Sequence, residues 1–189
     1  WKSKIKEMYP DTDSYLYFMG SINQWNGSLA IVFSLVGVSI MRKYSWFTAA
    51  IITPIMIFVT GMCFFTLIVF ENAAHILISS FFVVNPLMLA VLLGAVQNVL
   101  SKSSKYSLFD STREMTYIPI DEELRSKGKA AVDVVGARLA KSGGALVQSM
   151  LFMIFPAATY TSIAPFLMIV FAVVTIIWII TVRALNTEY

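Results

Sequence analysis

Five long apolar stretches constrain this chain more than any other feature. A helix needs about 20 predominantly apolar residues to cross a bilayer. The stretches that reach this length are approximately Ser14–Met41, Ser45–Phe70, Ile76–Ser101, Ala130–Phe155 and Ile163–Val182. Of the 189 residues, 58% are hydrophobic and 13% are charged, whereas a soluble domain is about 45–50% apolar and about 25% charged. The sequence therefore predicts an all-α polytopic membrane protein with about five transmembrane helices.

The composition disfavours several classes of function. A net charge of +3 is too small and too dispersed to indicate a nucleic-acid partner. The sequence contains one cysteine, Cys63, and one histidine, His75, so neither a disulfide framework nor a Cys or His metal site is expected. The spans hold no Ser/His or paired-carboxylate constellation, and GARLAKSGG lacks the glycine spacing of a phosphate-binding loop. An enzyme is therefore the least favoured class, and no cofactor or metal is expected.

Positive charge alternates between the loops. The Arg42 loop, the long polar segment 102–129 and the segment at Arg183 are basic, whereas 71–75 and 156–162 contain no Lys or Arg. The positive-inside rule therefore makes the first three cytoplasmic. The lysines within the first six residues then lie outside, contrary to that rule.

Five spans place the two ends of the chain on opposite sides of the membrane. A sixth span upstream would complete a six-helix unit, which is the half-size unit of many secondary transporters. We therefore expect residues 1–189 to form the C-terminal transmembrane half of a larger transporter whose N-terminal half lies outside this sequence.

The stretch GKAAVDVVGARLAKSGG, residues 128–144, opens a predicted span and yet carries Lys129, Asp133, Arg138 and Lys141. A charge at the bilayer centre costs about 2.5–3.5 kcal/mol on insertion scales, so such residues usually face a cavity or a partner. Positive charges outnumber the single negative one, which indicates a wet path for an anion. Lys129 and Asp133 are four residues apart and are expected to pair. Alternatively, Lys129 is cytoplasmic and only Lys141 lies within the membrane.

Polar residues also gather in two other places. Asn23, Gln24 and Asn26 lie in the first span, where they predict either hydrogen bonds between helices or a substrate-lining face. In segment 102–129, Asp110 and Arg113 with the adjacent Glu114 indicate either a gate that closes in one transport state or solvated ion pairs.

Three segments, WKSKIKEMYP, LSKSSKYSLFDSTREMTYIPID and KGKAAVDVVGARLAKSGG, resemble those of the nucleotide transporter family (ATP/ADP translocases) of obligate intracellular bacteria and plastids. The resemblance implies a twelve-helix carrier, similar in fold to the major facilitator superfamily, in a bacterial inner membrane or a plastid inner envelope. It implies ATP and ADP as the exchanged substrates and assigns a functional role to the lysine of KSGG, Lys141. A glutamate that the family uses would lie before Trp1.

With this resemblance, the charged and amide residues receive expected roles. Lys141, helped by Arg138, would contact phosphate, and Asp133 would orient Lys129 or Arg138 in the empty state. The amides of the first span would read the base or the ribose, with Tyr17 or Tyr15 as an aromatic face. The expected substrate-binding residues are Lys141, Arg138, Asp133, Lys129, Asn23, Gln24, Asn26 and Tyr17.

Other functions stay open at this point. A proton-coupled nucleotide importer of the same family would share these motifs. A non-transporting membrane scaffold or an ion-channel subunit is less favoured, because a scaffold would leave a lysine at membrane depth unexplained.

Overall fold

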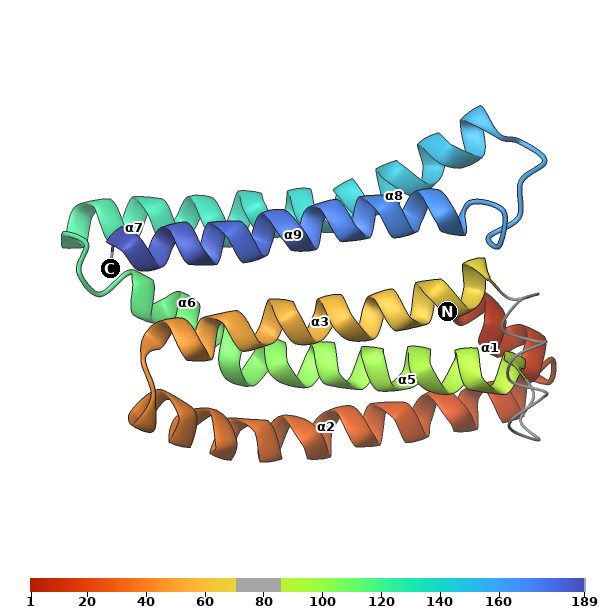
Figure 1. Cartoon of the computed structure of the whole chain (residues 1–189), viewed down its shortest axis with the longest axis horizontal. Helices are drawn as coiled ribbons and strands as arrows, with labels where there is room; N and C mark the ends of the chain where they lie inside the picture. Colours follow the sequence, from red (N-terminus) through yellow and green to blue (C-terminus); the bar gives the residue numbers. More distant parts are fainter. Residues whose placement is uncertain (71–85, 189) are drawn as a thin grey trace.

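The computed structural model describes residues 1–70 and 86–188, which are helical apart from short connections (Figure 1). Two π-helical segments join neighbouring helices into longer rods: η1 (Lys105–Phe109) and η2 (Ala131–Gly136). The α-helices are α1 (Lys2–Met8), α2 (Thr12–Lys43), α3 (Trp46–Val69), α5 (Pro86–Ser104), α6 (Asp110–Thr116), α7 (Glu122–Ala130), α8 (Ala137–Ile154) and α9 (Ala164–Glu188). The predicted loop at 71–75 and the start of the predicted third span lie outside the described residues.

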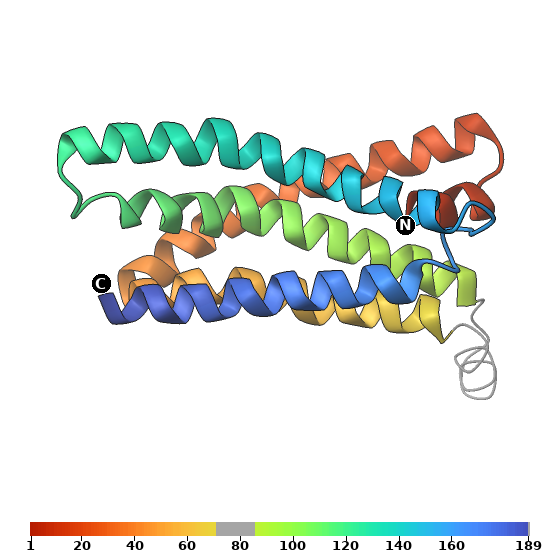
Figure 2. The same ribbon diagram turned by 90° about the horizontal axis from the view of Figure 1, so that it is seen from above.

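Within the described residues, five long rods run roughly along the long axis: α2, α3, α5–η1–α6, α7–η2–α8 and α9 (Figures 1 and 2). The α2–α3 connection, the turn between α6 and α7 and the C-terminus share one end. Helix α1 and the α8–α9 connection lie at the other end. Following the positive-inside rule, we call these the cytoplasmic end and the outer end.

Four helices within the described ranges are long and apolar enough to cross a membrane. They are Thr12–Lys43, Trp46–Val69, Leu87–Thr116 and Ala164–Thr187. These helices confirm the predicted class, an all-α polytopic membrane protein. Helix α8, which carries most of the predicted span 130–155, is not among them because Arg138, Lys141 and Gln148 make it less apolar.

The third rod continues as a helix to Thr116, whereas the sequence predicts a polar loop from residue 102. Its hydroxyl side chains explain the difference. The buried Ser107 and Thr112 donate hydrogen bonds to the carbonyls of Ser103 and Leu108, each at 2.8 Å. Because a Ser or Thr can bond to the preceding helical turn, it can be buried without an unpaired polar group. Residues 102–116 therefore extend a packed helix, and residues 117–121 form the turn to α7.

Two glycines allow close contacts in the packed part of the molecule. At Gly61 on α3, an added Cβ would lie 2.3 Å from Cζ of Phe171 on α9. At Gly94 on α5, an added Cβ would lie 2.0 Å from Cδ1 of Trp1, whose indole N–H donates to the Val91 carbonyl at 3.1 Å. The first contact fixes the spacing of α3 and α9, and the second holds the start of the chain against α5.

We expect Gly61→Ala to destabilise the α3–α9 pair by about 1–3 kcal/mol, because the new methyl group would displace the Phe171 ring from a packed position. The thermal unfolding midpoint of the full-length protein in detergent would measure the effect. Gly128→Ala is the matched control, since an added Cβ there meets nothing within 4 Å and alanine favours a helix by up to about 1 kcal/mol. A midpoint that stays unchanged for Gly61→Ala would contradict the tight α3–α9 contact.

Candidate functional site

The rod α7–η2–α8 carries the charged residues that the sequence analysis singled out. No residue between Glu122 and Ile154 is buried. Figure 2 shows the rod along one side of the molecule, away from α3 and α9. Large apolar side chains on it, such as Leu139 and Leu146, are more than half exposed. The described residues therefore leave most of the surface of this rod uncovered.

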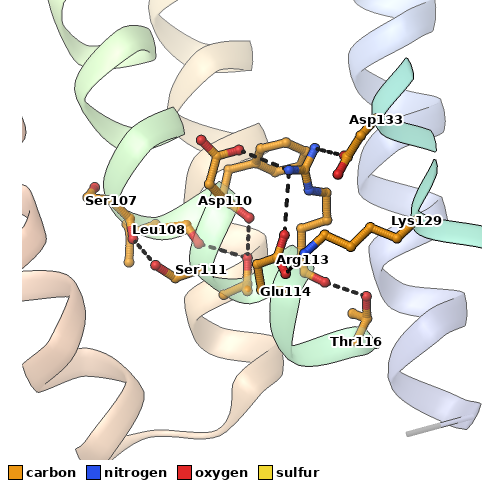
Figure 3. Close-up of polar contacts among 11 residues, drawn as sticks. Ser107, Leu108, Asp110, Ser111, Arg113, Glu114, Thr116, Lys129 and Asp133 are labelled. Carbon is orange, nitrogen blue, oxygen red and sulfur yellow. Dashed lines mark hydrogen bonds and ion pairs between the residues drawn. The ribbon is translucent and has the colours of Figure 1, made fainter. Parts of the chain in front are cut away.

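An ion cluster joins the cytoplasmic part of this rod to α6 (Figure 3). It consists of Asp110, Arg113, Glu114, Lys129 and Asp133. Arg113 lies at its centre, with Nη1 3.3 Å from Oδ1 of Asp133 and Nη2 3.8 Å from Oδ1 of Asp110. Nη2 also lies 3.9 Å from Oε1 of Glu114, whose Oε2 is 2.6 Å from Nζ of Lys129. Two cations and three carboxylates thus hold α6 against α7 and η2.

The ion cluster is also connected to α9 through aromatic rings. The guanidinium of Arg113 lies 5.8 Å from the centroid of the Phe109 ring, which meets Trp178 on α9 edge to face at 5.2 Å. The arginine side chain is 32% exposed, and its Nε is buried without a hydrogen-bond partner. Because this cation is partly removed from water, its ion pairs are less screened than those of a fully exposed residue.

The expected pairing of Lys129 with Asp133 is wrong. Both side chains are instead paired with residues of α6, Lys129 with Glu114 and Asp133 with Arg113. Asp133 therefore does not orient Lys129 or Arg138 in this structure. The physical reason is that Asp133 lies in the π-helical segment η2, whose wider turn does not stack residues four apart as an α-helix does.

Arg138 and Lys141 lie beyond the ion cluster, on α8, and both are exposed. In the part of the chain that the structure describes, neither is paired with a carboxylate. Lys141 lies near the middle of the rod that runs from Glu122 to Ile154. An added Cβ at Gly143 or Gly144 would meet nothing within 4 Å, so no other helix among residues 1–70 and 86–188 approaches these glycines closely.

The polar residues of α2 are separate from these two cations. Tyr17 is 81% exposed, and Asn23 and Gln24 are also exposed. Asn26 faces α5, where its carbonyl accepts a hydrogen bond from Ser103 Oγ at 3.3 Å and its side-chain amide is buried without a partner. Among the described residues, no hydrogen bond or ion pair joins these side chains to Arg138 or Lys141.

A cavity at the outer end was not predicted from the sequence. Its volume is about 740 Å³, and its polar lining includes Lys2, Lys6, Tyr15, Gln148 and Tyr160. The sequence held one sign of this cavity. The lysines of α1 contradict the positive-inside rule, so their position needed an explanation other than membrane topology.

The three sequence segments and the helical architecture agree with the comparisons to known proteins. The sequence matches the family model described as TLC ATP/ADP transporter over residues 1–189. The chain belongs to this family. It is 49% identical to ADP,ATP carrier protein 1 of Rickettsia typhi, and 48% identical to ADP,ATP carrier protein 4 of Rickettsia bellii and to ADP,ATP carrier protein 5 of Rickettsia felis.

Each of these alignments covers the whole chain but only 38%, 36% and 38% of the respective relative. The chain thus spans less than two fifths of the length of these carriers. No solved structure matches it, so the likeness to the major facilitator superfamily stays a prediction. Membership of the TLC ATP/ADP transporter family confirms the resemblance seen in the sequence, and the four apolar helices of the described residues fit a multi-pass membrane protein.

Proposed function

We propose that this chain is the C-terminal transmembrane half of an ATP/ADP antiporter that works by alternating access in a bacterial inner membrane. The family match and the relatives named ADP,ATP carrier protein support this function. The observation that carries the proposal is the pair of exposed cations on α8, Arg138 and Lys141, which no carboxylate neutralises among the described residues. The N-terminal half of the transporter would form the opposite wall of the substrate path, facing α8.

The two cations suit a polyphosphate tail for different reasons. Lysine is a compact point charge, and arginine offers a planar fork that matches two phosphate oxygens. Lys141 would contact the phosphates directly, and Arg138, three residues earlier on α8, would support it. Because the ion cluster occupies Lys129 and Asp133, we assign these two residues to holding the rod rather than to contacting phosphate.

The nucleoside part of the substrate needs contacts of another kind. The exposed amides of Asn23 and Gln24 can donate to and accept from a base or ribose, and Tyr17 offers an aromatic face. Asn26 has a buried, unpaired amide towards α5 and would join them after a movement of α2. These contacts would form when the N-terminal half brings the nucleotide between α2 and α8.

The positive charges of Arg138 and Lys141 would make the exchange of nucleotides obligatory. With the site empty, two cations at membrane depth lack a counter-ion, and moving them across a low-dielectric barrier is costly. A bound nucleotide supplies that counter-ion and lowers the cost. The loaded carrier would therefore change its direction of access readily and the empty carrier slowly, which couples the exit of one nucleotide to the arrival of another.

Uptake into proteoliposomes tests this function with the full-length transporter. We expect radiolabelled ATP to accumulate when the vesicles contain ADP and to stay near background when they are empty. An imposed pH gradient should change neither result. Uptake into empty vesicles that follows the pH gradient would instead indicate a proton-coupled importer, and conductance without saturation would indicate a channel.

A further inference from the structure

Helix α1 places two lysines on one face without a neutralising partner. Lys2 and Lys6 are four residues apart, exposed, and without an ion pair among the described residues. The intervening Lys4 is different, since it is buried and lies 3.2 Å from Glu7. Like charges four apart on a helix destabilise it. An anion bound to both would remove that repulsion.

Both lysines line the cavity at the outer end of the molecule. Its volume of about 740 Å³ falls within the range of about 300–1,000 Å³ that is common for small-molecule sites. Its walls combine the two cations with aromatic rings, namely Phe64 and Phe65 on α3 and Tyr160 in the α8–α9 connection. Cationic and aromatic walls together suit a ligand that carries both a phosphate tail and a flat ring.

Helix α8 connects this cavity with the proposed phosphate contact. Gln148 on α8 lines the cavity, and it lies seven residues after Lys141. Seven residues are nearly two helical turns, so the two side chains share a face and lie roughly 10 Å apart along the helix. The end of α8 and helix α1 lie at the same, outer end of the molecule (Figure 1). A nucleotide in the cavity would therefore already lie beside the α8 face that leads to Lys141.

We propose that this cavity is a second nucleotide site, an outer vestibule in which Lys2 and Lys6 bind the polyphosphate tail before the substrate reaches Lys141. The proposal rests on the proposed transport of nucleotides and adds to it a substrate-capturing site with its own residues. It also explains why lysines lie at the end of the bundle where the positive-inside rule disfavours them.

Uptake of ATP by intact bacterial cells that express the full-length transporter tests the vestibule, because these cells expose only its outer side. We expect Lys2→Gln/Lys6→Gln to raise the KM for external ATP by about tenfold, as loss of electrostatic attraction lowers capture. The maximal exchange rate should change by less than about twofold, because the proposed phosphate contact at Lys141 is intact. Lys2→Arg/Lys6→Arg should keep the wild-type KM. The matched control is Lys127→Gln, an exposed lysine on α7 at the opposite end.

Direct binding separates the vestibule from the proposed function. Calorimetry would use inorganic tripolyphosphate and the purified full-length Lys141→Ala protein in a neutral detergent. We expect binding that disappears when Lys2→Gln/Lys6→Gln is added. Such binding would support the vestibule even if the wild-type protein failed to exchange ATP for ADP. That failure would count against the antiporter alone.

Two outcomes would overturn the vestibule. One is equal tripolyphosphate binding with and without the two lysines. The other is a difference in ATP uptake between the wild type and Lys2→Gln/Lys6→Gln that appears only in vesicles containing anionic lipid. Such a difference would make the cavity a lipid headgroup site.

Discussion

Replacing Lys141 by alanine is expected to lower ATP/ADP exchange by at least about 30-fold while the full-length transporter still inserts into the membrane. The side chain is exposed on α8 and is paired with no carboxylate within the described ranges, so its removal breaks no internal ion pair. Truncating one partner of a desolvated charge pair costs about 2–5 kcal/mol of binding free energy, and the lower bound corresponds to this factor. Counter-exchange in proteoliposomes would measure it.

Two further variants make this result specific. Lys141→Arg keeps the charge but replaces the point charge with a planar fork, and it should retain part of the activity. Lys127→Ala removes an exposed lysine that pairs with Glu123 at 2.6 Å on α7, and it should exchange nucleotides like the wild type. Near-normal exchange by Lys141→Ala would refute the assignment of this residue to phosphate.

Arg113→Ala is expected to produce the second-largest effect, a decrease in exchange of about tenfold, equivalent to ~1.4 kcal/mol. Arg113 lies within ion-pair distance of Asp110, Glu114 and Asp133. Without it, Lys129 is the one counter-charge left to these three carboxylates among the described residues, so α6 and η2 repel each other. Asp133→Asn should have a smaller effect, because Arg113 then retains its two other carboxylates.

The measurement should separate a loss of positioning from a loss of folding. Exchange rate and thermal midpoint are therefore both needed for Arg113→Ala, Arg113→Lys and Asp133→Asn. A cluster that positions the rod predicts a lower exchange rate with a nearly unchanged midpoint, and partial rescue by Arg113→Lys. Equal losses of midpoint in Arg113→Ala and Asp133→Asn would instead show a purely structural network.

The sequence was sufficient for the helical class and for the family. The apolar spans predicted the membrane helices because burial in lipid requires long uninterrupted apolar runs. The KSGG segment directed attention to Lys141 because a charge at that depth is costly. These inferences depend on local composition and spacing, which a sequence displays directly.

The partners of the charged residues could not be predicted in the same way. Arg113 and Asp133 are twenty residues apart, and their contact depends on how residues 117–121 turn the chain back from α6 to α7. The π-helical register of η2 likewise follows no visible sequence period. The cavity at the outer end combines α1, α2, α3, α8 and α9, so no single segment reveals it.

The attachment of the long rod has a mechanical consequence. The rod is bound at its cytoplasmic part by the ion cluster, and none of its residues is buried along its length. It can therefore act as a lever with its fulcrum at Asp133. From there to Ile154 the helix extends roughly 30 Å at about 1.5 Å per residue. A tilt of only about 5° at the fulcrum would swing the far tip by roughly 3 Å, so a small rearrangement of one arginine's neighbours would be amplified into a wider opening at the opposite membrane surface.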